Sequence, residues 1–343
     1  LGANGQPIDT YTNDDVVGLA RVFTGFTLAG TSPRWQDRFD DAWERPMMMN
    51  DDAHSLREKR FLGTVIAENT PGEASIEQAL DRIFAHPNLA PFVSRQLIQR
   101  FTASDPDPAY VRRVATAFET GRFVADTGAA FGTGQRGDLS ATLAAILLDP
   151  TLHDDETTTR DGKVREPLLN FVHLARVYQG TPPDLVKPNW SVFADTSDVS
   201  NALSQSPLRS PSVFNFYRPG FVAAGTETGD LGLTAPELQI VNAGSAVGYM
   251  NFMFDFISRT DGANTVIPDF TKEMALANDA DALLDRINLS LTAGRMTDAT
   301  RAAIKDAVDA LPIRSNNDAT DRRSRVRIAV MMTVVAPEFM TLN

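Results

Sequence analysis

Apolar side chains recur at intervals of three and four residues along most of the chain, the spacing of one face of an α-helix. The strict alternation of apolar and polar positions that marks a half-buried strand is not found in the pattern. We therefore predict an all-α fold of about ten helices, in an irregular array with long ordered loops. These helices are expected at residues 13–25, 75–84, 89–101, 108–118, 139–147, 167–178, 197–203 and 235–253, and from residues 279, 297 and 318.

Short polar residues mark the points where several of these helices should begin. Thr12 or Asn13 can cap the first helix, because their side chains can accept from free backbone N–H groups. Ser75, with a glutamine three residues later, fits a capping box, and Asp138 fits a cap for the helix that follows it. Pro236 suits the first turn of a long helix that starts at about residue 235.

The regions between helices suggest how the chain is organised. Residues 30–73 lack a helical period but are rich in Trp and Met, so we expect an ordered loop packed on the core. The glycine-rich residues 121–137 indicate a flexible surface excursion, and residues 180–189 with three prolines are the best candidate for a hinge. We predict a helical core region at 1–180 and a second helical region at 181–343 packed on it, forming one continuous domain.

Composition excludes several classes of protein. The 343 residues are 43% hydrophobic and carry a formal net charge of -12, so the chain can bury a core and repels phosphate backbones. We expect no nucleic-acid partner, and no apolar run is long enough to predict a membrane span. Cysteine is absent, which removes disulfides and thiolate chemistry. The chain begins at Leu1 without a Met, so we expect that a leader or a longer upstream segment has been removed.

Cofactor and metal motifs are weak. Residues 132–137 match the glycine spacing of a dinucleotide fingerprint, but they follow a predicted helix instead of a strand, so no cofactor is expected. No two of the four His residues share the spacing that places two metal ligands on one helix face. Asp51, Asp52 and His54 are weak metal candidates, and a solvated acidic turn explains them more simply.

Catalytic residues cannot be assigned from these patterns. No Ser lies in a nucleophile-elbow motif. Neighbouring carboxylates such as Asp40 and Asp41 rarely face one another and are typical of solvated loops. His86 lies before a proline at a helix junction, where we expect it to bond a free backbone carbonyl.

The most informative residues are cations and amides within apolar surroundings. The segment 205–220 interleaves Pro, aromatic, Arg and amide residues without any period, which indicates an ordered functional loop. Buried guanidinium groups need carboxylates or carbonyls to offset their desolvation. Such groups could form a structural network that fixes helix packing, or a polar pocket for a carboxylate, sulfate or sugar. The residues in question are Arg95, Gln96, Arg100, Arg165, Glu166, Arg209, Asn215 and Arg218.

Six separated motifs, in order along nearly the whole chain, resemble the bacterial family called domain of unknown function 1800 (DUF1800). They are Tyr11 to Phe26, His54-Ser55 with Lys59 to Gly63, His86 to Arg100, Arg136 to Leu139, Arg165 to Pro167 and Gln205 to Gly220.

This resemblance implies a mainly helical, exported bacterial protein, periplasmic or extracellular, without a settled activity. Members of the family usually carry a further N-terminal helical region, which this chain lacks, and are often encoded beside a sulfatase-like protein. The resemblance therefore suggests three partners: the absent N-terminal segment, a second polypeptide, or a sulfatase-like protein.

We predict that the polar residues of these motifs cluster around one patch. The patch would comprise His54, Lys59, His86, Arg95, Gln96, Arg100, Arg165, Glu166, Arg209, Asn215 and Arg218. The leading hypothesis is a binding or assembly protein that associates with another polypeptide. The alternative is a hydrolase acting on a surface polymer through carboxylates or a metal near His54, so the sequence leaves open whether the protein is an enzyme.

Overall fold

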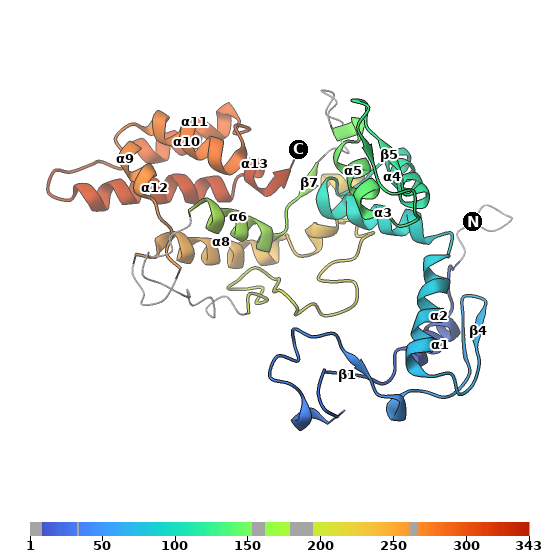
Figure 1. The fold of residues 1–343 in the computed structure, drawn as a ribbon. Helices are drawn as coiled ribbons and strands as arrows, with labels where there is room; N and C mark the ends of the chain where they lie inside the picture. Colours follow the sequence, from blue (N-terminus) through green and yellow to red (C-terminus); the bar gives the residue numbers. More distant parts are fainter. Residues whose placement is uncertain (1–8, 33, 153–161, 179–194, 261–265, 343) are drawn as a thin grey trace. The chain divides into compact units, whose positions relative to one another are not determined.

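The computed structural model describes residues 9–32, 34–152, 162–178, 195–260 and 266–342. In this part of the chain it contains thirteen α-helices and four small antiparallel pairs of strands (Figure 1). The prediction of a mainly helical fold with long loops is therefore confirmed. The chain forms two compact units, residues 1–92 (unit 1) and 93–343 (unit 2).

The longer helices follow the predicted segments closely. Thr12 caps the first, and its side chain and that of Asp15 bond each other's backbone N–H groups. Asp138, Asp279 and Thr297 cap three others through bonds to backbone N–H groups. The helices are α1 (Asn13–Val22), α2 (Gly72–Phe84), α3 (Leu89–Phe101), α4 (Pro108–Thr120), α5 (Leu139–Leu147), α6 (Pro167–Val177), α7 (Glu227–Asp230), α8 (Ala243–Ser258), α9 (Thr271–Leu276), α10 (Ala280–Thr292), α11 (Asp298–Asp309), α12 (Asp318–Val334) and α13 (Pro337–Met340).

Two predicted helix starts were wrong. Helix α2 begins at Gly72, and the Ser75 hydroxyl is buried within it, where it donates to Thr70 O at 3.3 Å instead of capping. The helix expected from residue 235 is a short 3-10 turn, Pro236–Gln239, and α8 begins only at Ala243. Asn242 supplies that start, because its side-chain oxygen accepts from the N–H groups of two residues in the first turn.

The prediction of a helix at 197–203 was also wrong. These residues form turns, in which the Asp198 carboxylate accepts from Ser200 N at 2.7 Å and from Asn201 N at 3.2 Å. Ala202 N donates to Asp198 O at 3.0 Å, but this one helical bond is not continued into a helix.

The strands are two or three residues long, too short for their alternation to stand out in the sequence. The pairs are β1 (Phe26–Thr27) with β2 (Met48–Met49), β3 (Lys59–Phe61) with β4 (Thr64–Ile66), β5 (Phe123–Val124) with β6 (Ala130–Phe131) and β7 (Lys163–Val164) with β8 (Thr341–Leu342). The β5–β6 hairpin lies inside the glycine-rich stretch, so part of the expected excursion is regular structure. The dinucleotide-like motif that follows it leads into α5 without a parallel strand.

Unit 1 is built from α1, α2 and the β3–β4 hairpin. Gly18 allows α1 to lie directly on the hairpin, since a Cβ there would be 1.8 Å from Arg60 O. The small core contains Val22, Phe61, Ile66 and Ala79. Two residues of the predicted 30–73 loop therefore do belong to the core, although they lie on strands.

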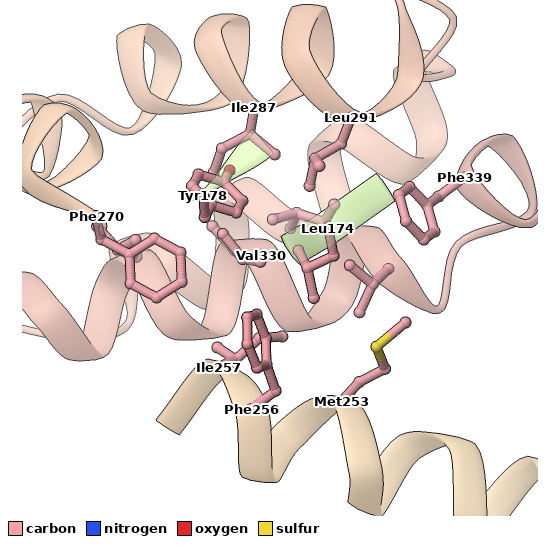
Figure 2. Packing of buried hydrophobic residues seen from close by; sticks show 14 of the residues in the cluster. Leu174, Tyr178, Met253, Phe256, Ile257, Phe270, Ile287, Leu291, Val330 and Phe339 are labelled. Carbon is pink, nitrogen blue, oxygen red and sulfur yellow. The ribbon is translucent and has the colours of Figure 1, made fainter. Parts of the chain in front are cut away.

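The described part of unit 2 has two apolar cores. The smaller joins α3, α4 and α5, where the Tyr110 hydroxyl donates to Ile146 O at 2.8 Å. The larger surrounds α12, which lies between α8 on one side and α10 with α11 on the other (Figure 1). Figure 2 shows Met253 and Phe256 of α8 pointing toward Leu174 of α6 and Val330 of α12.

The predicted boundary between residues 180 and 181 and the predicted hinge at 180–189 lie outside the described residues. Helix α6, before that boundary, shares the larger core with α8, α10 and α12, which follow it. In the described part of the chain, no helix combines the length and the apolar character that crossing a bilayer requires.

Glu338 of α13 ties the end of the chain to the start of α11. One of its carboxylate oxygens accepts from Thr297 N at 3.0 Å, Thr297 Oγ1 at 2.6 Å and Thr300 Oγ1 at 2.8 Å. Burial alone would raise the pKa of Glu338, but these donors favour the charged form and lower the pKa to about 2.

This low pKa predicts how stability depends on pH. The ordinary pKa of the group is 4.5, so between about pH 4.5 and pH 2 the unfolded chain binds a proton there and the folded chain does not. The stabilisation from Glu338 is complete above this window and is lost as the pH falls through it. We expect the difference in free energy of unfolding between wild type and Glu338→Gln, measured by urea titration, to shrink from pH 5 to about pH 2. If this difference in free energy of unfolding stays constant between pH 5 and pH 2, Glu338 does not have the lowered pKa described above.

Candidate functional site

The predicted polar patch draws on residues of both units. His54, Lys59 and His86 belong to unit 1, and the other eight candidates belong to unit 2. A single patch that unites residues of both units stays a prediction.

His54 holds two segments of unit 1 together. Its ring is buried, and Nδ1 lies 2.9 Å from Thr24 O, which can only accept, so Nδ1 carries a proton. Nε2 lies 3.3 Å from the buried hydroxyl of Ser75 on α2. Both ring nitrogens therefore have partners within the unit.

The weak metal candidates beside His54 do not form a ligand set. Asp51 accepts from Gly72 N at 2.9 Å and so fixes the start of α2. Asp52 is exposed. Among the residues that the structure describes, no group of three or more His, Asp or Glu side chains is arranged to hold a metal ion.

Lys59 and His86 differ in their surroundings. The Lys59 side chain is fully buried beside the small core, its Nζ has no hydrogen-bond partner among the described residues, and burial lowers its pKa. The His86 ring accepts from Asn88 N at 3.1 Å. This contact, which the sequence did not predict, shapes the turn between α2 and α3. The predicted bond from His86 to a backbone carbonyl stays a prediction.

In unit 2, Glu166 is the centre of a group of polar side chains. It lies just before α6, is buried, and forms an ion pair with Arg100 of α3. Its second oxygen accepts from the Gln205 side chain. The same Arg100 nitrogen also donates to the hydroxyl of Tyr217, and its guanidinium lies 5.4 Å from the centre of that ring.

These contacts shift two pKa values in the same direction. Burial raises the pKa of Tyr217, and the neighbouring Glu166 carboxylate raises it further. Burial opposes the charge of Arg100, but Glu166 and Tyr217 more than offset this and raise its pKa. Arg100 is therefore a permanent cation and Tyr217 a neutral phenol.

A second ion pair extends the group. Lys163 of β7 pairs with Glu237, and both side chains are almost completely buried. The other oxygen of Glu237 accepts from Ser104 Oγ at 2.9 Å. Gln99 of α3 donates to Ser104 O at 3.0 Å and to Pro219 O at 2.9 Å. Seven of these eight residues are buried, whereas the Arg100 side chain is 40% exposed. We call the eight the buried polar cluster: Gln99, Arg100, Ser104, Lys163, Glu166, Gln205, Tyr217 and Glu237.

The buried polar cluster holds both ends of the segment 205–220, which we call the 205–220 loop. Gln205 attaches its first end to Glu166, and Tyr217 attaches its second end to Arg100. Between them, residues 207–214 are exposed and form the loop tip. Leu208 and Val213 of the tip are fully exposed, and Phe214 is more than half exposed.

Arg165 faces away from this cluster, although it is adjacent to Glu166 in sequence. Its buried guanidinium donates to Phe339 O at 2.9 Å, lies 2.8 Å from His173 Nδ1 and stacks 5.0 Å above the Phe339 ring. Burial, and to a lesser degree Arg295, lower its pKa. Burial and then Arg165 lower the pKa of His173. Arg165 thus joins the start of α6 to α13.

With this geometry established, comparison with known proteins identifies the family. A family model described as "Protein of unknown function (DUF1800)" matches residues 1–341. The chain belongs to the DUF1800 family. No curated protein and no solved structure matches it. The resemblance seen in the sequence motifs is confirmed.

Of the eight predicted unit 2 residues, the DUF1800 chain brings two into the buried polar cluster, Arg100 and Glu166. Arg95 is exposed and Gln96 is half-buried on α3. Arg209 forms an exposed ion pair with Asp195 at 2.9 Å. Asn215 has a φ of 66° and helps to turn the loop, and the Arg218 side chain is exposed.

Sequence reasoning missed the other members of the cluster. Gln205 and Tyr217 lie in the loop that was marked as functional, but no pattern indicated their roles. Lys163 and Glu237 are 74 residues apart, and a Glu after a Pro is typical of any helix start. Nothing in the local sequence showed that this ion pair would be buried.

The arrangement favours a structural role for the cluster in the DUF1800 chain. All four carboxylate oxygens of Glu166 and Glu237 accept hydrogen bonds from neighbouring side chains. A general acid or base needs a carboxyl oxygen within reach of a substrate. Here each carboxylate instead fixes segments that are distant in sequence.

The Lys163–Glu237 pair yields a stability prediction. Lys163→Met leaves a buried carboxylate without its cation, which should cost about 3–5 kcal/mol in free energy of unfolding. Replacing both residues, as Lys163→Met with Glu237→Leu, should cost less than the sum of the two single changes by about 2 kcal/mol or more. Urea unfolding of the four proteins measures this coupling.

A matched control is Lys305→Met. Lys305 also pairs with carboxylates, those of Asp281 and Asp309, but on the surface, where the loss of stability should be much smaller than for the buried pair. If Lys163→Met lowers the free energy of unfolding no more than Lys305→Met does, the buried pair does not stabilise unit 2.

Proposed function

We propose that this protein is a non-enzymatic binding protein that attaches to a second polypeptide through the tip of the 205–220 loop. The observation that carries the proposal is the contrast between the two parts of the loop. Its ends are fixed by Glu166 and Arg100, whereas Leu208 and Val213 are fully exposed. Solvent-exposed apolar side chains on an ordered loop are typical of interaction sites.

Fixing the ends of the loop favours binding. A loop that is already ordered loses less conformational entropy when a partner binds, so more of the contact energy appears as affinity. Further bonds order the loop, including Arg209 N to Ser206 O at 3.2 Å and Arg218 N to the Gln239 side chain at 2.9 Å. The buried polar cluster thus serves the function indirectly, by holding the tip in one conformation.

The charge of the loop indicates the chemistry of the partner. Residues 205–220 contain two Arg residues and neither Asp nor Glu, in a chain whose formal net charge is -12. A basic, apolar loop on an acidic protein is complementary to a surface that combines apolar and acidic side chains. We therefore propose a partner polypeptide with apolar residues flanked by Asp or Glu.

The family resemblance supplies two further parts of the proposal: where the protein meets its partner, and which proteins are candidates for that partner. An exported protein would meet its partner in the periplasm or outside the cell. A sulfatase-like protein encoded nearby is one candidate for that partner, and an N-terminal helical region of the kind that the resemblance implies is another.

The alternative of a polymer hydrolase gains no support from the described residues. Glu166 and Glu237 are buried and each is neutralised by a cation. His54 uses both ring nitrogens within unit 1. Neither arrangement offers a reactive group to a substrate.

The test is selection of binding peptides from a random twelve-residue display library on the intact chain, followed by measurement of their affinities. Peptides that combine apolar and acidic residues should be enriched. The double change Leu208→Ser with Val213→Ser should weaken their binding at least tenfold, because it removes exposed apolar contacts without touching the buried polar cluster.

The matched control is Leu289→Ser, which changes an exposed leucine on α10 and should leave binding unchanged. The proposal fails if the loop variant binds the selected peptides as well as wild type does, or if no peptide is enriched. Sedimentation of the chain alone completes the test. If wild type self-associates and the loop variant does not, the partner is a second copy of this chain.

A further inference from the structure

Unit 2 contains a pocket of about 170 Å³ that is separate from the loop tip. It is lined by the start of α6, residue 203, one face of α8, the end of α12 and α13. The side chains that shape it include Pro167, Leu203, Ala246, Tyr249, Met250 and Met340.

The polar atoms of the lining are already occupied. Ser245 Oγ donates to Ile240 O at 2.6 Å, and the Tyr249 hydroxyl donates to Val334 O at 2.9 Å. The Asn242 side chain accepts from Gly244 N at 2.9 Å at the start of α8. A ligand in the pocket would therefore meet mainly apolar surface, and none of the residues that line the pocket carries a charge.

The size of the pocket sets the size of the ligand. Drug-sized ligands occupy sites of roughly 300–1,000 Å³, whereas an apolar cavity of about 150 Å³ holds one benzene molecule. Two methionines line the pocket, and their flexible, polarisable side chains adapt to rings and pack well against them. The dimensions and the chemistry both indicate a single uncharged ring.

From these features we propose that the pocket between α6, α8 and α13 is a binding site for a small, uncharged aromatic molecule of one ring. The site does not depend on the loop tip. Binding removes apolar surface of the ring and of the pocket wall from water, which is the driving force. A charged substituent would lose its hydration without gaining a partner, so a charged ring should be rejected.

The test uses toluene as the ligand and benzoate as its charged counterpart. In the intact chain labelled with ¹³C at the methionine methyl groups, toluene should shift the signals of Met250 and Met340 and saturate at one molecule per chain. Met250→Leu and Met340→Leu assign the two signals. Benzoate should bind at least tenfold more weakly than toluene.

Two matched variants on α8 locate the site. Ala246 lies at the exposed mouth of the pocket, so Ala246→Phe should fill it at little cost to folding and weaken toluene binding at least tenfold. Val247 is exposed and does not line the pocket, so Val247→Phe should bind toluene like wild type.

Three results would overturn the proposal: the absence of saturable shifts, equal binding of toluene and benzoate, or equal binding by Ala246→Phe and wild type. Competition between toluene and the peptides selected on the loop tip would also overturn it, since the pocket would then receive a partner's side chain. Failure of the loop to bind peptides leaves the pocket proposal intact, so the two proposals are tested independently.

Discussion

The carboxylate of Glu166 is where three segments of unit 2 meet. It accepts from Arg100 at the end of α3 and from Gln205 at one end of the 205–220 loop, and Arg100 in turn holds Tyr217 at the other end. A buried carboxylate is costly unless its oxygens are matched by cations or donors. If the segments separated, the Glu166 carboxylate would lose the donors that offset its burial. This one group therefore fixes the loop and the packing of two helices together.

The same principle recurs with cations that bond backbone carbonyls. Arg325 on α12 is buried and donates to Leu311 O at 2.7 Å and to Ala277 O at 2.9 Å. Arg165 does the same for Phe339 O, and Arg82 of unit 1 donates to Leu62 O at 2.8 Å. A guanidinium reaches several acceptors at fixed angles, so it can join irregular segments that neither helix nor sheet bonds would connect. This explains how the protein keeps long loops ordered with few strands.

The sequence predicts local structure well, because helix starts depend on a few neighbouring residues. Asp138 could be read directly as a cap, and Thr12 was one of the two cap candidates for the first helix. The errors at Ser75 and Pro236 have the same origin, since each resembles a helix start but a competing partner, Thr70 O or the Asn242 cap, decides the outcome. Arg100 and Glu166 were found through their unusual surroundings. Lys163 and Glu237 were not, because their pairing arises only from the tertiary fold.

The central claim is that Glu166 orders the 205–220 loop, and hydrogen exchange of backbone amides tests it most directly. Comparison of wild type, Glu166→Ala and the control Asp321→Ala, which removes a carboxylate bound to Arg314, separates local from global effects. The amides of Gln205, Arg209 and Arg218, which are bonded in the folded loop, should exchange at least tenfold faster in Glu166→Ala, with those of α12 unchanged. Asp321→Ala should leave the loop protected. Equal protection of the loop in Glu166→Ala and wild type, or equal acceleration in the loop and α12, would contradict the claim.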